Sequence, residues 1–230
     1  PAVMDGHPRY VVPQGESYLY EFEVKNRAGT YWYHPHPHGR TGPQVYGGLA
    51  GLFLVSDDEE QAVGLPDGEY DIPLVIRDRT FNGDNQLVYM PRNRMAQMTG
   101  FLGDSILVNG RPDVTLPVSN TAYRLRLLNG SNSRIYRLAW QDGRALTIIG
   151  SDGGLLEKPV SRAYVFLAPG ERIELWSDFS DHPLGYETAL ISLPFEGGGM
   201  GRGMMMGGNQ NLPNGANVSL FNIKVTKSVT

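Results

Sequence analysis

Cysteine is absent from the 230 residues of this sequence, which excludes disulfides and thiolate metal sites. Positive charge is sparse as well: 20 Lys and Arg stand against 24 Asp and Glu, and no basic cluster is dense enough to follow a phosphate backbone. No run of about 18 apolar residues could span a membrane, and no charged or apolar leader-like region opens the sequence. We therefore expect a soluble chain with no nucleic-acid partner and no membrane span.

Glycine and proline are plentiful, at 29 and 16 residues, and long helical periodicities are few. Short apolar or alternating stretches separated by turn residues favour an all-β fold. We expect strands at 29–33 and 51–56, and a further strand at 17–24 that forms a hairpin with 29–33 through a turn at 26–29. Strands at this density are typical of Greek-key sandwiches or barrels.

Length and strand count divide the chain into two units. Residues 1–57 hold too few strands to close a sandwich, so we interpret them as the C-terminal half of a first domain. The acidic stretch 57–60 is suited to a solvated loop and opens a linker over 58–70. Residues 71–230 form the second domain, with a Gly/Met-rich loop at 197–208. Its predicted strands are 72–77, 105–108, 122–128, 136–140, 145–149, 163–167, 171–176, 188–193 and 218–225.

Three of the five histidines lie within the segment 31–39, Tyr-Trp-Tyr-His-Pro-His-Pro-His-Gly. On an extended backbone His34, His36 and His38 can point to one side at intervals of about 7 Å, as suits a metal cluster. The intervening prolines cannot donate ladder hydrogen bonds, so the segment should lie at a sheet edge or strand end, open to another domain. Neutral imidazole suits Cu, Zn, Fe or Ni, and the spacing does not choose among them. A His-X-His pair is also a common surface feature of strands.

The segment 29–39, followed by Gly-Gly-Leu-Ala-Gly at 47–51, resembles the second copper-binding motif of multicopper oxidases of the laccase and cuprous-oxidase type. Residues 5–8 and 13–17 resemble the linker after the family's first His-X-His motif, which would lie just before Pro1. Further segments, in order, are similar to the copper-free middle cupredoxin domain of three-domain members: 103–110, 124–132, 150–154 and 167–172. The resemblance covers nearly the whole chain and implies an internal fragment with one partial and one complete cupredoxin-like domain.

This resemblance also implies a role for each polar residue of the motif. His34 and His36 match two ligands of the paired type 3 coppers, part of a trinuclear type 2/type 3 centre that reduces dioxygen to water. His38 matches a residue outside the ligand set that orients a ligand or holds nearby structure. Asp5 matches an acidic residue that assists proton delivery in the cuprous-oxidase branch, and a surface-turn Asp is the alternative.

Several parts that such an enzyme needs are missing from this sequence. The type 1 blue copper requires a Cys ligand, and the first, third and fourth His-X-His motifs are absent. We therefore expect the 230-residue fragment to supply only part of the trinuclear centre and to be inactive without the remaining domains of the same protein.

The Gly/Met-rich loop suggests a second place for copper. Thioether sulfur is a soft ligand suited to Cu(I), and members of the copper-handling branch carry Met-rich segments near the site of electron entry. One hypothesis is transient Cu(I) capture by these methionines, and a connector between domains is the alternative. The four residues concerned are Met200, Met204, Met205 and Met206.

Three functions are compatible with these features. The first is a multicopper oxidase that oxidises phenolic substrates or Cu(I) and reduces dioxygen. The second is a non-catalytic cupredoxin-fold scaffold, like the copper-free relatives that act in cell division, and the retention of His34 and His36 argues against it. The third is a zinc-binding protein, for which the spare His7 and His182 offer no convincing third ligand. Because the similar enzymes are exported, the resemblance implies a periplasmic or extracellular location.

Overall fold

The structure is a computed structural model that describes residues 2–7, 9–90, 100–196 and 212–229. The chain is nearly all β, with 42% of residues in strands and 8% in helices, which confirms the predicted fold class. Among the described residues, no helix is both long enough and apolar enough to cross a bilayer.

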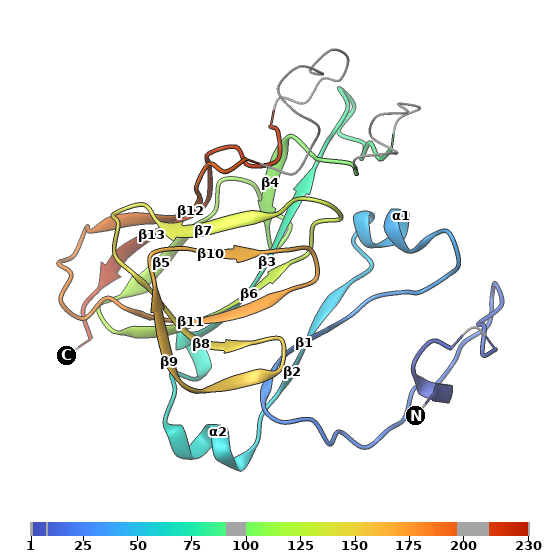
Figure 1. Ribbon diagram of the computed structural model, residues 1–230, viewed down its shortest axis with the longest axis horizontal. Coiled ribbons are helices and arrows are strands. Elements are labelled where there is room, and N and C mark those ends of the chain that lie inside the picture. Colours follow the sequence, from blue (N-terminus) through green and yellow to red (C-terminus); the bar gives the residue numbers. More distant parts are fainter. Residues whose placement is uncertain (1, 8, 91–99, 197–211, 230) are drawn as a thin grey trace.

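The helices are short and lie outside the main sheets (Figure 1). In chain order they are the 3-10 helix η1 (Ala2–Met4), α1 (Thr41–Tyr46), α2 (Asp58–Val63) and the 3-10 helix η2 (Gly68–Tyr70). The strands are β1 (Gly29–Tyr33), β2 (Gly51–Val55), β3 (Asp71–Arg79), β4 (Ser105–Val108), β5 (Thr115–Ser119), β6 (Ala122–Asn129), β7 (Tyr136–Trp140), β8 (Leu146–Ser151), β9 (Gly154–Arg162), β10 (Val165–Leu167), β11 (Arg172–Asp178), β12 (Glu187–Ser192) and β13 (Val218–Lys227).

Two large sheets pack face to face as a β-sandwich and form most of the molecule (Figure 1). We call it the second sandwich, because it follows the small N-terminal sheet in the chain. One has the order β10-β7-β12-β13-β5, and the other has the order β4-β3-β6-β11-β8-β9. Most neighbours are antiparallel, but β3 pairs with β6, and β13 with β5, in parallel. Buried side chains from both sheets, such as Leu138, Leu190, Leu125 and Leu175, fill the space between them.

Strand β6 shows how the sequence directs this packing. Leu125 and Leu127 are completely buried in the core between the sheets. Arg124 and Arg126 alternate with them, and because successive side chains of a strand point to opposite faces, they lie on the outer face of the sheet. That outer face is covered by α2, whose Glu60 contacts both arginines, and by β1, whose Thr30 contacts Arg126.

The N-terminal part of the chain forms a separate two-stranded sheet. Strand β1 pairs antiparallel with β2, from Gly29 opposite Val55 to Tyr33 opposite Gly51. The same strand packs closely on the second sheet, because a Cβ added to Gly29 would lie 2.8 Å from Cα of Gly154 at the start of β9. This contact requires a residue without a side chain on β1.

The predicted strand at 17–24, and its hairpin with 29–33, are wrong. The segment has no regular structure, and β1 pairs with β2 instead. Its apolar side chains Tyr20, Phe22 and Val24 are 52%, 49% and 45% exposed. Alternation produces a strand only where a neighbouring strand accepts the backbone hydrogen bonds and a core receives the side chains, and this segment meets neither.

The solvated loop predicted for the acidic stretch 57–60 is also wrong. Asp57 caps α2, since its carboxylate accepts a hydrogen bond from the backbone N–H of Glu60 at 2.8 Å. Acidic residues in the first turn suit the positive end of the helix dipole. Glu60 is only 7% exposed and faces the arginines of β6. In contrast, every strand predicted between 72 and 225 overlaps an observed strand, although β5 and β9 were not predicted.

Candidate metal site

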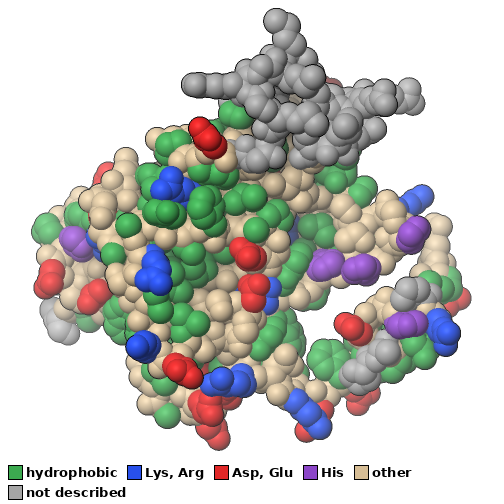
Figure 2. Space-filling model, in the orientation of Figure 1, with side chains coloured by type: hydrophobic (Ala, Val, Ile, Leu, Met, Phe, Trp, Pro, Cys, Tyr) green, Lys and Arg blue, Asp and Glu red, His purple; other side chains and the backbone are tan. Residues whose placement is uncertain are grey.

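The histidine segment continues from the end of β1. This strand stops at Tyr33, and the following residues lie outside the ladder, as the two prolines predict. The ring centroids of His34 and His36 are 5.7 Å apart, with the planes inclined by 35°. His34 is half-buried and His36 is exposed. Figure 2 shows histidine side chains on the face turned toward the N-terminal segment, so two neighbouring imidazoles are accessible there.

One ring nitrogen of His34 is already engaged. Its Nδ1 lies 3.0 Å from the backbone carbonyl oxygen of Pro35. Because a carbonyl oxygen can only accept, Nδ1 must carry the proton and donate it. In the neutral ring Nε2 then carries the lone pair that a metal ion requires. Fixing the tautomer through the other nitrogen is how proteins orient histidine ligands.

An aromatic stack supports His34. The indole of Trp32 lies 4.5 Å from the His34 ring, centroid to centroid, with an inclination of 33°. Gly170, in the turn before β11, touches the same indole: a Cβ added there would lie 3.2 Å from Cζ2 of Trp32. The second sandwich therefore contacts His34 through one intervening side chain.

The N-terminal segment approaches the histidines at Gly6. A Cβ added to Gly6 would lie 3.9 Å from Cβ of His36. Asp5 is the preceding residue and is exposed, so the fold brings it close to His36 although they are far apart in the sequence. His38 is exposed and precedes the turn into α1.

The two spare histidines are engaged elsewhere. Nδ1 of His7 accepts a hydrogen bond from the backbone N–H of Arg9 at 3.2 Å. His182 stacks on Tyr186, with 3.8 Å between ring centroids and an angle of 10°. Within the described ranges, no group of three or more His, Cys, Asp or Glu side chains converges to hold a metal ion. The methionines of the 197–208 loop, Met200, Met204, Met205 and Met206, lie outside the described residues.

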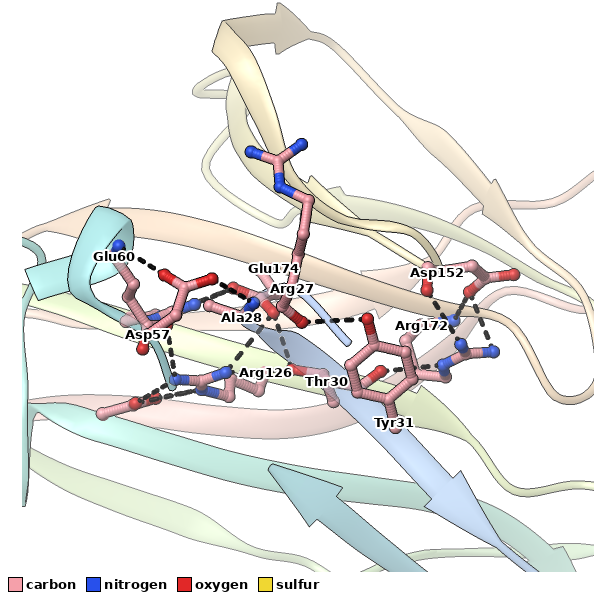
Figure 3. Close-up of polar contacts among 12 residues, drawn as sticks. Arg27, Ala28, Thr30, Tyr31, Asp57, Glu60, Arg126, Asp152, Arg172 and Glu174 are labelled. Carbon is pink, nitrogen blue, oxygen red and sulfur yellow. Dashed lines mark hydrogen bonds and ion pairs between the residues drawn. The ribbon is translucent and has the colours of Figure 1, made fainter. Parts of the chain in front are cut away.

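A buried cluster of charged residues fixes β1 on the second sandwich (Figure 3). The carboxylate of Glu174, on β11, accepts a hydrogen bond from the hydroxyl of Thr30 at 2.7 Å. It also accepts from Nε and Nη2 of Arg124, at 2.8 and 2.5 Å. Glu174 is completely buried and Thr30 is 1% exposed. A strand that leads to His34 is thus held by a bond that solvent does not reach.

The same cluster holds α2. Glu60 accepts from Arg124 at 2.5 Å and from Arg126 at 3.3 Å. Arg126 also pairs with Asp71, at 2.7 Å. Burial lowers the pKa of Arg126, but the hydrogen bond to Asp71 and the charges of Glu174, Asp71 and Glu60 outweigh it and raise that pKa above its usual value. The guanidinium therefore stays charged inside the protein.

Known proteins resemble both the sequence and the fold. A profile described as "Multicopper oxidase" matches residues 2–60. A laccase from Bacillus stratosphericus is 39% identical over 211 residues, which cover 84% of this chain and 41% of that protein. The crystal structure of the McoA multicopper oxidase from Aquifex aeolicus superposes with a TM-score of 0.82 at 42% identity, over 98% of this chain and 48% of that chain. The chain belongs to the multicopper oxidase family.

Not all similar proteins are named as oxidases. The cell division protein FtsP of Sodalis glossinidius is 42% identical over 192 residues, which cover 83% of this chain and 39% of that protein. This multicopper oxidase chain spans about two fifths of the length of these curated relatives. Its family is one of copper oxidoreductases with cupredoxin-like domains, which confirms the resemblance seen in the histidine segment.

The side chains at the histidine segment fit copper. Imidazole nitrogen is a good ligand for copper ions, and the contact of Nδ1 with Pro35 leaves Nε2 of His34 available. Two imidazoles from one segment do not complete the coordination of a metal ion. This chain can therefore contribute part of a copper site.

Several supporting residues were not predicted from the sequence. Arg124 and Arg126 stand two apart among leucines in a predicted strand, and two arginines on one face of a buried strand require carboxylate partners. The two arginines could therefore have predicted buried ion pairs on this strand. Their partners were not, because Glu174 and Glu60 lie 50 and 64 residues from Arg124 in the sequence. The stack of Trp32 on His34 was missed for a different reason, since ring orientation depends on contacts with the second sandwich.

Proposed function

We propose that this chain supplies His34 and His36 to a trinuclear type 2/type 3 copper centre, in a protein that oxidises a small reducing substrate and reduces dioxygen to water. The observation that carries the proposal is the pair of adjacent imidazoles beyond the end of β1, with His34 held in the tautomer that leaves Nε2 for a metal. Bound copper would supply the one-electron chemistry that joins the two half-reactions.

The residues around the pair have separate tasks in this proposal. Asp5 is exposed beside Gly6, which approaches His36. Its carboxylate can exchange protons with solvent and deliver them to the site. His38 orients the segment and binds no copper. Capture of Cu(I) by the 197–208 methionines stays a prediction, because it falls on residues outside the described ranges.

The rest of the centre must come from elsewhere in the protein. We propose that residues 1–57 are the C-terminal half of a first domain, that 58–70 link it to the second, and that 71–230 form a complete domain without copper. Remaining domains of the same protein would supply the type 1 copper, since this sequence contains no Cys. The reducing substrate is a small phenol or Cu(I), and the protein acts in the periplasm or outside the cell. Without those domains the chain is inactive.

A second candidate function is a non-catalytic cupredoxin-fold scaffold. The similarity to a protein named for cell division favours it. His34 and His36 favour the oxidase instead, because a scaffold has no need of two accessible imidazoles with one tautomer fixed. A zinc site formed by this chain alone is disfavoured, because no third ligand converges among the described residues.

The first test is the intact mass and copper content of the undigested protein. We expect a mass about twice 25.4 kDa, since the chain covers 48% of the McoA chain, together with several copper ions. A protein of 25.4 kDa without copper would support the scaffold.

The second test assigns the ligands. Replacing both histidines, as His34→Ala with His36→Ala, should weaken Cu(II) binding by on the order of 100-fold or more in a chelator competition. His182→Ala is the matched control, because His182 is stacked on Tyr186 and takes no part in the pair. Equal copper affinity in the double variant and the control would refute the ligand assignment.

A further inference from the structure

Arg172, the first residue of β11, ties three backbone segments together (Figure 3). Its Nε donates to the carbonyl oxygen of Thr30 at 2.9 Å, and its Nη1 donates to that of Gly170 at 2.9 Å. Its Nη2 donates to the carbonyl oxygen of Asp152 at 3.1 Å, and the Asp152 carboxylate lies 3.2 Å from Nη1. The side chain is only 13% exposed. All three guanidinium nitrogens are occupied, and their separation in a planar fork lets one side chain reach all three segments, whereas the three N–H donors of a Lys ammonium share a single nitrogen.

The Gly170 end of this clamp faces Trp32. Gly170 has a φ of +82°, and its N–H donates to the carbonyl oxygen of Asn129 at 2.8 Å. The backbone of Gly170 therefore forms a fixed surface against the indole, and an added Cβ would lie only 3.2 Å from Cζ2 of Trp32. A side chain at this position would push the indole away, and the backbone conformation is one that other residues rarely adopt.

The Thr30 end holds the strand that carries Trp32. The carbonyl of Thr30 is bound by Arg172, and its hydroxyl is bound by Glu174. Trp32 lies two residues further along the same strand, opposite Leu52. Both the backbone of β1 and the indole are thus held by the second sandwich. The His34 ring rests against that indole at 4.5 Å.

We propose that Arg172 and Gly170, acting through Trp32, position the His34 imidazole for metal binding. The inference rests on the proposed role of His34 as a copper ligand, and it makes Arg172 and Trp32 positioning residues. Two contacts restrict the ring: the indole limits its tilt, and the Pro35 carbonyl binds Nδ1. A ligand oriented before the metal arrives loses less conformational freedom on binding. The second sandwich, which contains neither His34 nor His36, would then set the geometry of one of them.

The test uses two variants and one control. Trp32→Leu keeps an apolar side chain and removes the aromatic face. Arg172→Lys keeps the charge and removes the fork that joins Thr30 to Gly170. Arg144→Lys is the control, because Arg144 also donates to a backbone carbonyl, that of Asp178 at 3.1 Å, in contacts that include neither β1 nor the turn before β11.

Two measurements are made on the purified protein with added Cu(II). In a chelator competition, Trp32→Leu and Arg172→Lys should each weaken Cu(II) binding by on the order of tenfold, while Arg144→Lys does not. The hyperfine splitting in the electron paramagnetic resonance spectrum at one equivalent of Cu(II) should shift in the same two variants. Thermal melting of each protein shows whether it is folded, and if Trp32→Leu is unfolded, Arg172→Lys decides.

Wild-type affinity and an unchanged spectrum in folded Trp32→Leu and Arg172→Lys would overturn the inference. So would an equal loss in Arg144→Lys, because the effect would then be general destabilisation. The variant His34→Ala distinguishes a failure of the positioning role from a failure of the proposed function. If His34→Ala loses copper and the positioning variants do not, only the positioning role is wrong. If His34→Ala binds copper as the wild type does, the ligand assignment itself is wrong.

Discussion

Replacing Glu174 by Gln tests what holds the two parts of the chain together. The Glu174 carboxylate is completely buried and accepts hydrogen bonds from Thr30 at 2.7 Å and from two nitrogens of Arg124 at 2.8 and 2.5 Å. Gln preserves the size of the side chain. It removes the charge, however, and replaces one accepting oxygen by an amino group that faces the same donors.

The expected loss follows from the composition of the cluster. Two arginines, Arg124 and Arg126, face three carboxylates, Glu60, Asp71 and Glu174, which leaves one excess negative charge. Removing one partner of a buried ion pair costs roughly 3–5 kcal/mol. Because Glu60 still pairs with both arginines after Glu174→Gln, we expect the lower end, about 3 kcal/mol. For a folding unit of roughly 150–250 residues this corresponds to a fall in Tm of about 6–12 °C.

The assay is urea unfolding followed by circular dichroism, with Glu187→Gln as the matched control. Glu187 pairs with Lys224 at 2.6 Å, but the two side chains are 62% and 47% exposed, so that substitution should cost no more than about 1 kcal/mol. Thr30→Val removes the bond to Glu174 and the longer one that the Thr30 hydroxyl accepts from Nη1 of Arg126 at 3.3 Å. It should cost about 1–3 kcal/mol, because it leaves a buried acceptor and a buried donor each short of one partner. If Glu174→Gln costs no more than Glu187→Gln, the buried cluster does not stabilise the junction and the reasoning fails.

Two further predictions concern the cap of α2 and a close backbone contact at the end of β3. Hydrogen bonds from the backbone N–H of Ala28 and from the first turn of α2 hold the pKa of Asp57 below its usual value. The stabilisation by Asp57 is therefore present above the unfolded pKa of about 3.9 and is lost as pH falls through the lower folded pKa. Acid unfolding of Asp57→Asn should depend less on pH in that range than acid unfolding of the wild type, and an unchanged acid transition would contradict this. A Cβ at Gly103 would lie 2.3 Å from the backbone nitrogen of Arg79. Gly103→Ala should therefore lower the free energy of unfolding, measured in urea, by about 2 kcal/mol or more. Gly153→Ala is the control and should leave that free energy nearly unchanged, because a Cβ there would meet nothing within 4 Å.

Much of the fold could be predicted from the sequence, because β-structure depends largely on local alternation. Strand β6 alternates leucines with arginines, and its inward and outward faces follow from that pattern. The helix α2 could also have been predicted, because Asp57 followed three residues later by Glu60 has the spacing of a capping box. Its acidic character was misinterpreted as solvation, although Glu60 lies 7% exposed against arginines. The segment 17–24 shows the opposite error, since its alternation meets no partner strand in the structure.

The sequence by itself determined that two imidazoles lie side by side, because the spacing of His34 and His36 and the stiffness of the intervening proline are properties of the local backbone. Only the tertiary structure decided how those imidazoles are held. Thr30 meets Glu174 across 144 residues of sequence, and Trp32 meets Gly170 through a turn on another sheet. Such contacts depend on how the sheets pack, and a local sequence pattern does not predict which distant turn or carboxylate contacts a given strand.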